Sequence, residues 1–369
     1  MLLLLALVSA YACQPREVSA PDRGAPAAPA SAAVAALSWP PTGLAPRKAS
    51  TPVFRVRDTC THPSLAVLGD FDYRKEITYR EAGAKALALD LMVPRGAGPH
   101  PVVLLIHGGG WIAGKRDEMY HEGLMLVEQG IAAALVEYRL AREKASNFPA
   151  AVRDLRCAVR FLRARAGAYR LDPRRMVAMG PSSGGHLAAL LAAAGGDKLM
   201  DDVACPHRAQ PADIMGAVVF SAPLDLRPFM GPRVPDLIIK TFLGQSPLDR
   251  PDLAAQASPV THLDPDDPPF LVVHGADDIL VPPDLSRRFV WTLKRLGVPS
   301  LYVEIPGAGH GFFLFKETPR FRRSTCTTIG FIRDLFGMHA REPPPPTLPV
   351  RAGPPGAPAG AYPAPVARP

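Results

Sequence analysis

The hexapeptide GPSSGG, Gly180–Gly185, is the stretch that decides the fold of this chain. It follows a short apolar run, Met176–Met179, and leads into the alanine- and leucine-rich run Gly184–Ala194. Glycines two residues before and two residues after Ser182 let a chain turn sharply from a strand into a helix, which leaves the serine hydroxyl exposed. The neighbouring Ser183 lacks this glycine spacing. The pattern therefore predicts a strand–turn–helix unit with Ser182 as a nucleophile.

A second glycine-rich segment, HGGGW at His107–Trp111, follows the continuous apolar run Pro101–Ile106. Such a run is typical of a buried parallel strand. Glycines at its end let a substrate approach the backbone closely, so that N–H groups can stabilise a developing oxyanion. We predict that the backbone N–H groups of Gly109, Gly110 and Ser183 form the oxyanion hole.

The expected base is His310, which follows the predicted strand Leu301–Ile305 and a loop that contains two glycines. These glycines would let the loop bring the imidazole to the serine. The sequence contains other histidines near predicted strand ends and at the start of the helix after the turn, for which we favour structural roles: His107, His186 and His274.

An acid is needed to orient His310 and to stabilise its protonated form. Asp277 and Asp278 follow the predicted strand Phe270–His274 and are the best-placed carboxylates. Adjacent residues point in different directions, so only one of the two is expected to reach the histidine. Two more distant alternatives are Asp225 and Asp213.

Strands alternate with helices along the middle of the chain, which predicts an α/β fold with a mostly parallel sheet covered on both faces. Asp172-Pro173 is expected to form a turn before the strand Met176–Met179. The remaining expected strands are 74–80, 86–93, 131–138 and 214–221, and the expected helices are 116–129, 148–166, 184–194, 283–296 and 319–336. Residues 223–267 are predicted to be a small lid with one helix, Pro235–Leu243.

The two ends of the chain differ from its middle in composition. Residues 1–52 and 341–369 hold 19 of the 43 prolines and lack amphipathic periodicity, which favours disorder. We therefore predict one catalytic domain over residues 51–340, preceded by a Pro/Ala-rich linker, residues 13–50, and followed by a Pro-rich tail, residues 341–369. The net charge of +8 comes mainly from scattered arginines, and no basic run interleaved with aromatics supports nucleic-acid binding.

The first twelve residues are leucine-rich and end in Ala10-Tyr11-Ala12, which resembles a signal-peptidase site. The run is too short to span a membrane. The next residue, Cys13, resembles a lipoprotein attachment site, although no basic residue precedes the apolar run. The sequence therefore predicts export, with Cys13 as a candidate lipid anchor.

Four further cysteines, Cys60, Cys157, Cys205 and Cys326, could pair in an exported protein, and the sequence leaves three full pairings open. Because Cys157 falls within a predicted helix, a buried thiol is at least as good an interpretation of that residue. The cysteine spacings match no zinc pattern. The oligomeric state has no signal in the sequence.

In these motifs and their order, the chain resembles the HGGG-bearing branch of the α/β-hydrolase superfamily, and in particular BD-type feruloyl esterases, bacterial carboxylesterases and kynurenine formamidases. The likeness covers approximately Tyr73–Phe336 and includes EYRLA at 137–141, FPAAVRD at 148–154 and PPFLVVHG at 268–275. It implies Ser182 as nucleophile, His310 as base and Asp278, four residues after His274, as acid. The chain departs from the family pattern at two positions: Ser183 stands where alanine usually follows the nucleophile, and Pro181 lies between Gly180 and the nucleophile.

The combined motifs predict a serine hydrolase that cleaves small-molecule carboxylic esters without a metal or an organic cofactor. Alternatives are an amidase acting on N-formyl substrates, a prolyl-type peptidase, and a surface binding protein with a retired site. Because the predicted lid is short and broken by prolines, we expect a shallow pocket that prefers acyl groups of about two to six carbons.

Overall fold

The computed structural model describes residues 54–57, 60, 71–82, 85–142, 147–228, 234–311 and 319–338. The predicted signal segment with Cys13, the linker and the tail lie outside these residues. Within the described ranges, no helix is both long enough and apolar enough to cross a membrane.

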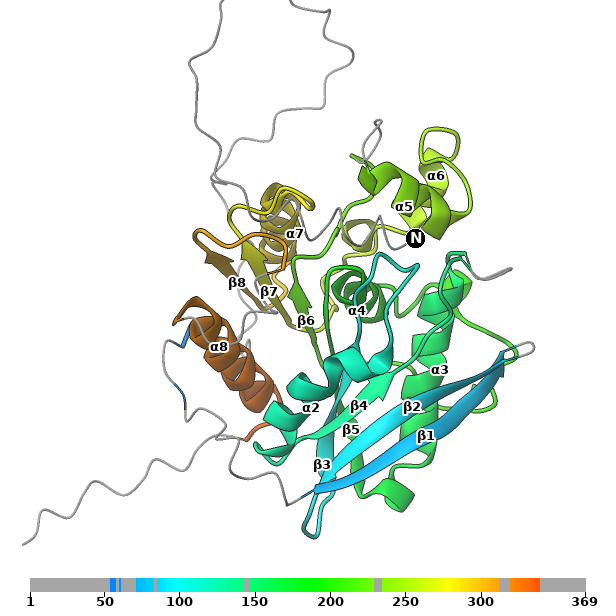
Figure 1. Ribbon diagram of the computed structural model, residues 1–369, viewed down its shortest axis with the longest axis vertical. Helices are drawn as coiled ribbons and strands as arrows, with labels where there is room; N and C mark the ends of the chain where they lie inside the picture. Colours follow the sequence, from blue (N-terminus) through cyan, green and yellow to red (C-terminus); the bar gives the residue numbers. More distant parts are fainter. Residues whose placement is uncertain are drawn as a thin grey trace, which may run out of the picture.

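An eight-stranded sheet in the order β1-β2-β4-β3-β5-β6-β7-β8 forms the centre of the molecule (Figure 1). The β1–β2 and β2–β4 pairs are antiparallel and all other neighbours are parallel, which confirms the predicted mostly parallel sheet. The strands are β1 Phe71–Ala82, β2 Lys85–Pro94, β3 His100–Ile106, β4 Ala132–Val136, β5 Leu171–Pro181, β6 Ala217–Phe220, β7 Phe270–Gly275 and β8 Ser300–Ile305.

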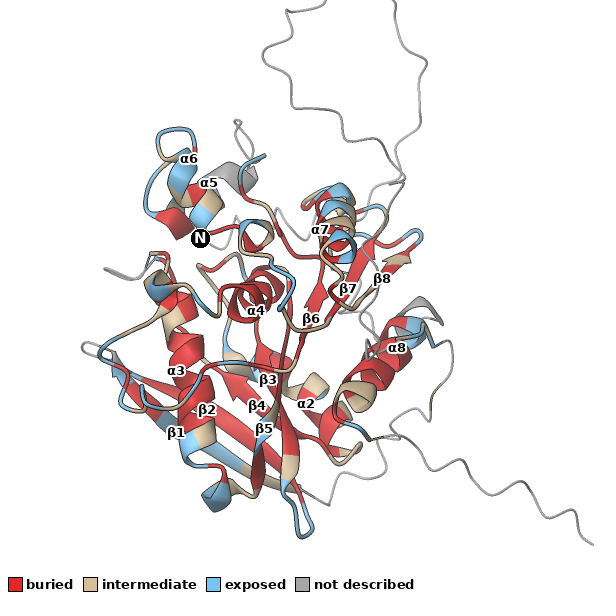
Figure 2. Cartoon of the chain, turned by 180° about the vertical axis from the view of Figure 1, so that it is seen from behind, coloured by how far each residue is buried: buried red, intermediate tan, exposed pale blue. Residues whose placement is uncertain are grey.

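Helices cover both faces of the sheet, as a doubly wound fold requires. One hydrophobic cluster packs α3, α4 and α7 on one face, and a second packs α2 and α8 on the other. Strands β4, β6 and β7 are buried along their whole length between these layers (Figure 2), whereas β5 is exposed at Pro173 and Arg174 near its start. The helices are α2 Tyr120–Val127, α3 Ala150–Ala164, α4 Ser183–Ala193, α5 Val234–Leu243, α6 Pro251–Gln256, α7 Pro283–Arg295 and α8 Pro319–Leu335, with short 3-10 turns at η2 Arg116–Met119, η3 Gly167–Tyr169, η4 Lys198–Met200 and η5 Pro259–Thr261.

Two predictions about local structure were wrong. Asp172-Pro173 is not a turn that precedes the strand but lies inside β5. At this point the register between β5 and β3 shifts, since His100 pairs with Leu171 and Val102 pairs with Met176. The Asp172 carboxylate accepts the backbone N–H of Arg174 at 2.9 Å, so this polar segment closes on itself as a bulge and the strand continues on either side.

The second wrong prediction concerns the lid, which contains α6 in addition to the expected α5. Pro251 occupies the first turn of α6, where a proline needs no intrahelical partner for its nitrogen. The prolines that made this region look irregular thus include one that starts a helix.

Two disulfides join segments that are distant in the sequence. Cys60 is bonded to Cys326 on α8, and Cys157 on α3 is bonded to Cys205. The interpretation of Cys157 as a simple buried thiol was therefore wrong, because the loop after η4 returns across α3 and brings Cys205 within a Cα–Cα distance of 5.7 Å.

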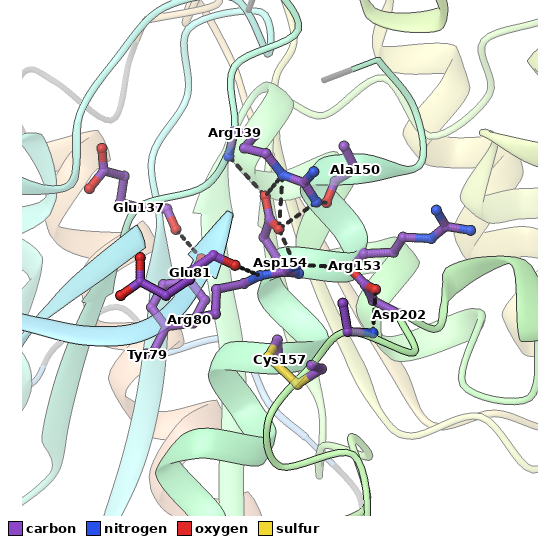
Figure 3. A network of polar contacts seen from close by, with 12 residues as sticks. Tyr79, Arg80, Glu81, Glu137, Arg139, Ala150, Arg153, Asp154, Cys157 and Asp202 are labelled. Atoms are coloured by element: carbon purple, nitrogen blue, oxygen red, sulfur yellow. Dashed lines mark hydrogen bonds and ion pairs between the residues drawn. A yellow bond between two sulfur atoms is a disulfide. The ribbon is translucent and has the colours of Figure 1, made fainter. Parts of the chain in front are cut away.

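Near the second disulfide, the fully buried Asp154 of α3 connects three parts of the fold (Figure 3). Arg80 of β1 donates to Asp154 Oδ1 at 3.0 Å, and Arg139, which follows β4, donates to both carboxylate oxygens at 2.8 and 2.9 Å. Arg80 also reaches Asp202 beyond η4 at 2.9 Å. This network fixes the segment after β4 against α3.

Asp267, just before β7, gives a pH-dependent stability prediction. Burial, together with the nearby carboxylates of Asp264 and Asp266, raises the pKa of Asp267 to about 7. The folded state therefore holds this proton more tightly than the unfolded chain, where the pKa is about 3.9, and stability falls as the pH rises from about 4 to 7. Asp267→Asn, which stays neutral, should raise the Tm at pH 8 by about 2–4 °C and leave it unchanged at pH 4. Thermal unfolding at both pH values measures this, and an equal gain at pH 4 would contradict it.

Candidate active site

Ser182 stands at the turn between β5 and α4 with φ 51° and ψ −122°, a conformation that side chains rarely adopt. Its backbone N–H donates to Phe220 O at 2.7 Å and so ties the turn to β6. The glycines on either side serve close packing as well as the turn. A Cβ at Gly180 or at Gly184 would collide with the backbone carbonyl oxygen of Ile106 at the end of β3.

The three side chains predicted as nucleophile, base and acid lie together. His310 Nε2 is 3.0 Å from Ser182 Oγ, and His310 Nδ1 is 2.8 Å from Asp278 Oδ2. Ser182 precedes α4, Asp278 follows β7 and His310 follows β8, so all three come from the carboxyl ends of parallel strands. Ligands of open α/β sheets bind at this edge.

The loops after β7 and β8 are held to one another by their backbones. The N–H of Asp277 donates to Ala308 O at 2.9 Å, and a Cβ at Gly275 would collide with the same carbonyl group. Gly275 therefore allows the loop after β8, which carries His310, to approach the loop after β7, which carries Asp278, closely. Asp277 itself is exposed.

Asp278 is buried, and both of its oxygens accept hydrogen bonds. Oδ1 accepts the backbone N–H groups of Leu280 and Val281 at 3.0 and 2.9 Å, while Oδ2 faces His310 and also His274 Nε2 at 3.1 Å. Burial by itself would raise the pKa of Asp278, but the hydrogen bonds from the two histidines outweigh burial and hold that pKa well below its usual range. The carboxyl group is therefore ionised at neutral pH.

The more distant alternatives for the acid lie in other surroundings. Asp225 forms an ion pair with Arg227 at 2.8 Å, and the backbone carbonyl of Asp213 accepts a hydrogen bond from Arg163 at 2.8 Å.

The HGGG segment forms a left-handed turn, with φ of 108° at Gly109 and 60° at Gly110. A side chain at Gly109 would collide with the backbone of Ala113, so only glycine fits there. The lid approaches this turn directly: a Cβ at Gly110 would lie 2.9 Å from Ile238 Cγ2 on α5.

Trp111, next to this turn, anchors the lid through aromatic contacts. Its ring stacks on Phe242 of α5 with centroids 4.3 Å apart, and its Nε1 donates to His186 Nδ1 at 3.2 Å. Burial lowers the pKa of His186 to about 3, so that its ring is neutral and Nδ1 can accept. His186 Nε2 in turn lies 2.7 Å from Ala257 O in the segment after α6. The predicted structural role of His186 thus extends to holding the lid.

Sequence reasoning missed two groups at this site. Ile238 gave no signal, because a helical position in an insertion does not show what it faces. Ser286, buried on α7, lies 2.7 Å from His274 Nδ1. No local sequence motif marks Ser286 as a partner of that histidine. His274 itself hydrogen-bonds at a strand end, as predicted, and its partners include the carboxylate of Asp278.

The described part of the chain brings no three His, Cys, Asp or Glu side chains together in a way that could hold a metal ion. The contacts described above bring together a hydroxyl, an imidazole and a carboxylate. This set can transfer a proton from Ser182 and make its oxygen a nucleophile.

Asp278→Asn is expected to lower kcat by about 10⁴-fold, because an amide can neither stabilise the imidazolium nor hold the His310 tautomer whose Nε2 accepts from Ser182. The matched change Asp277→Asn should have little effect, since Asp277 is exposed. Steady-state ester hydrolysis by the two variants measures this. A large loss at Asp277→Asn alone would transfer the role of the acid to that residue.

The BD-FAE family profile matches residues 89–293 of the chain. The chain is 30% identical over 308 residues to the probable carboxylic ester hydrolase LipM of Mycobacterium tuberculosis, covering 78% of this chain and 67% of LipM. It is 29% identical over 249 residues to the esterase LipQ of the same organism, covering 66% of this chain and 58% of LipQ. The chain thus spans about 58–67% of the length of these relatives.

Among solved structures, the acetyl ester-xyloside bifunctional hydrolase of Caldicellulosiruptor lactoaceticus matches with a TM-score of 0.62 and 25% identity, over 71% of this chain and 96% of that protein. Together with the sheet order and the helix layers, these similarities confirm the predicted α/β-hydrolase fold and the resemblance to BD-type esterases.

Proposed function

This chain belongs to the BD-FAE family of carboxylesterase-type α/β-hydrolases, and from this premise we propose that it hydrolyses carboxylic esters of short-chain acids through an acyl-enzyme on Ser182. The observation that carries the mechanism is the unbroken chain of contacts from Ser182 Oγ through His310 to Asp278 Oδ2, at 3.0 and 2.8 Å.

In the first half of the reaction, Ser182 Oγ attacks the ester carbonyl and its proton moves to His310 Nε2. Asp278 stabilises the resulting imidazolium through the proton on Nδ1 and remains ionised. The tetrahedral intermediate collapses as Nε2 returns that proton to the departing alcohol. In the second half, His310 Nε2 takes a proton from water, and the water oxygen attacks the acyl carbonyl to form a second tetrahedral intermediate. This intermediate collapses as Nε2 gives that proton to the departing Ser182 Oγ, which releases the acid and restores the free enzyme.

The oxyanion of each tetrahedral intermediate would be stabilised by the backbone N–H groups of Gly109, Gly110 and Ser183. The left-handed φ angles of the two glycines and the absence of their side chains support this role, since the substrate oxygen must approach the backbone closely. Ser183 is the first residue of α4, so its N–H lies at the positive end of the helix dipole.

The preference for short acyl groups rests on the position of the lid. Ile238 contacts the oxyanion turn at Gly110, and Phe242, one helical turn later, stacks on Trp111. Residues four apart lie on one face of a helix, so this face of α5 is held down at two points beside the oxyanion turn. Ile238 would then limit the space for an acyl chain and make the pocket shallow.

A p-nitrophenyl ester series tests the substrate class and the pocket together. We expect kcat/KM to be highest at about two to six acyl carbons and to fall for longer chains. Ile238→Ala should move the maximum toward longer chains, because it opens the wall beside Gly110. Leu237→Ala is the matched control and should leave the profile unchanged, because Leu237 is 61% exposed on the same helix.

Two results would contradict this substrate assignment. A maximum at about ten carbons or more, with activation at a lipid interface, would indicate a lipase. Faster turnover of N-formylkynurenine or of proline amides than of any ester would favour an amidase or a peptidase.

We also propose that the enzyme works outside the cytosol. The two disulfides support this, because such bonds form and persist in oxidising compartments. Fractionation of the producing cells tests it: the protein should be found with exported proteins. Recovery in the cytosol with free thiols would contradict it.

A further inference from the structure

His274 is fully buried at the end of β7, and its ring nitrogens have three partners. Nε2 lies 3.1 Å from Asp278 Oδ2 and 3.0 Å from Val281 O. A carboxylate oxygen and a backbone carbonyl oxygen can only accept hydrogen bonds. Nε2 must therefore carry a proton, which it donates toward both oxygens.

The other ring nitrogen fixes the orientation of the ring. His274 Nδ1 lies 2.7 Å from the hydroxyl of Ser286, which is fully buried on α7. In the neutral tautomer, Nδ1 accepts the hydroxyl proton and the ring cannot turn without losing bonds on both sides. The ring thus connects α7 to the loop that carries Asp278.

We propose that His274 is a positioning residue that holds Asp278 Oδ2 in place for His310, an inference that rests on the proposed function of Asp278 as the acid. The two carboxylate oxygens of Asp278 have different hydrogen-bond partners. Oδ1 is fixed by two backbone N–H groups, whereas Oδ2 faces only the two imidazoles among the hydrogen bonds of the described residues.

Without the His274 proton, the carboxylate would keep the bonds on Oδ1 but could rotate about them and carry Oδ2 away from His310 Nδ1. A displacement of about 1 Å in a catalytic array can cost about 10²-fold in rate. A histidine that only filled space in the core would not need a proton on the nitrogen that faces the acid, so the two roles predict different results for polar replacements.

Two amide variants separate these roles. The amide nitrogen of His274→Gln can take the place of Nε2 and donate to Asp278, whereas the shorter amide of His274→Asn can take the place of Nδ1 and contact only Ser286. Both leave a smaller side chain in the same cavity. We expect kcat of His274→Asn to fall by about 10²-fold with KM little changed, and kcat of His274→Gln to stay within about tenfold of the wild type.

The readouts are kcat and KM for p-nitrophenyl acetate, the rate of fluorophosphonate labelling of Ser182, and the Tm of each variant. Equal kcat values for the two amide variants, or a loss confined to KM, would overturn the positioning role. If neither variant folds, Ser286→Ala decides: it frees the His274 ring and should lower kcat by about threefold or more, and an unchanged kcat would overturn the proposal.

The wild-type protein and Ser182→Ala are measured in the same assays. A wild type that neither hydrolyses esters nor reacts with the fluorophosphonate would refute the proposed function, and the positioning role would fall with it. An active wild type with equal amide variants would refute the role of His274 alone.

Discussion

Ser182→Ala is expected to lower kcat by about 10⁶-fold, to the level at which the remaining site acts without a nucleophile. The hydroxyl is the only group that forms the proposed acyl-enzyme, and His310 has no other proton to take from the enzyme in the first step. Because the change removes one oxygen and keeps the backbone turn, the Tm should stay close to that of the wild type. Ester hydrolysis and labelling by a fluorophosphonate probe measure the loss.

Ser183→Ala is the matched control, since it makes the same chemical change one residue along the chain. Its backbone N–H, which we assign to the oxyanion hole, is kept, so the effect on kcat should be small. An inactive Ser183→Ala beside an active Ser182→Ala would show that the nucleophile has been assigned to the wrong serine.

Asp154→Ala is expected to lower the free energy of unfolding by about 3–5 kcal/mol, the usual cost of breaking a buried ion pair by removing one partner. Asp154 is fully buried between Arg80 and Arg139, and Arg80 itself is 5% exposed. Without the carboxylate, these guanidinium groups would lose a shared partner in a place that water reaches poorly. Urea unfolding followed by circular dichroism measures the change.

Asp252→Ala provides a control for burial. Asp252 pairs with Arg250 at 2.7 Å, and both side chains are about half exposed. The pair therefore has the same chemistry and a similar distance but lies in water, and its loss should leave the urea midpoint unchanged. Equal effects of the two substitutions would mean that burial does not decide the contribution of Asp154.

The three side chains of the proposed triad could be predicted to lie together because each one is tied to a local pattern. The glycines around Ser182 are needed where α4 begins so close to the end of β3, and Gly275, before Asp278, is needed for the close approach of Ala308. In the loop that leads to His310, Gly307 has a positive φ of 67°. The fold could be predicted on the same basis, since apolar strands and amphipathic helices alternate along the chain. The glycine pattern around Ser182 is required by contacts at the carboxyl ends of neighbouring strands, where a Cβ would meet the carbonyl oxygen of Ile106.

The groups that support the site could not be predicted, because their partners are distant in the sequence. The EYRLA segment includes Arg139 and the FPAAVRD segment includes Asp154, but nothing local shows that Arg80 on β1 completes the network. Likewise, the four cysteines allow three pairings, and only the folded chain selects one of them. For α5, amphipathic periodicity could predict a helix but not which turn its apolar face would contact.

The disulfide between Cys60 and Cys326 affects the choice of the first residue in a truncated form of the protein. Phe54 packs on Phe331 of α8 with ring centroids 4.4 Å apart, and the Arg57 guanidinium reaches Asp334 at 3.0 Å. A fragment that starts at the first strand would lack these contacts, leaving a buried free thiol and an uncovered aromatic ring on α8. The described residues before β1 thus contact α8 through Phe54, Arg57 and Cys60, and a truncation designed from the sheet alone would remove these contacts.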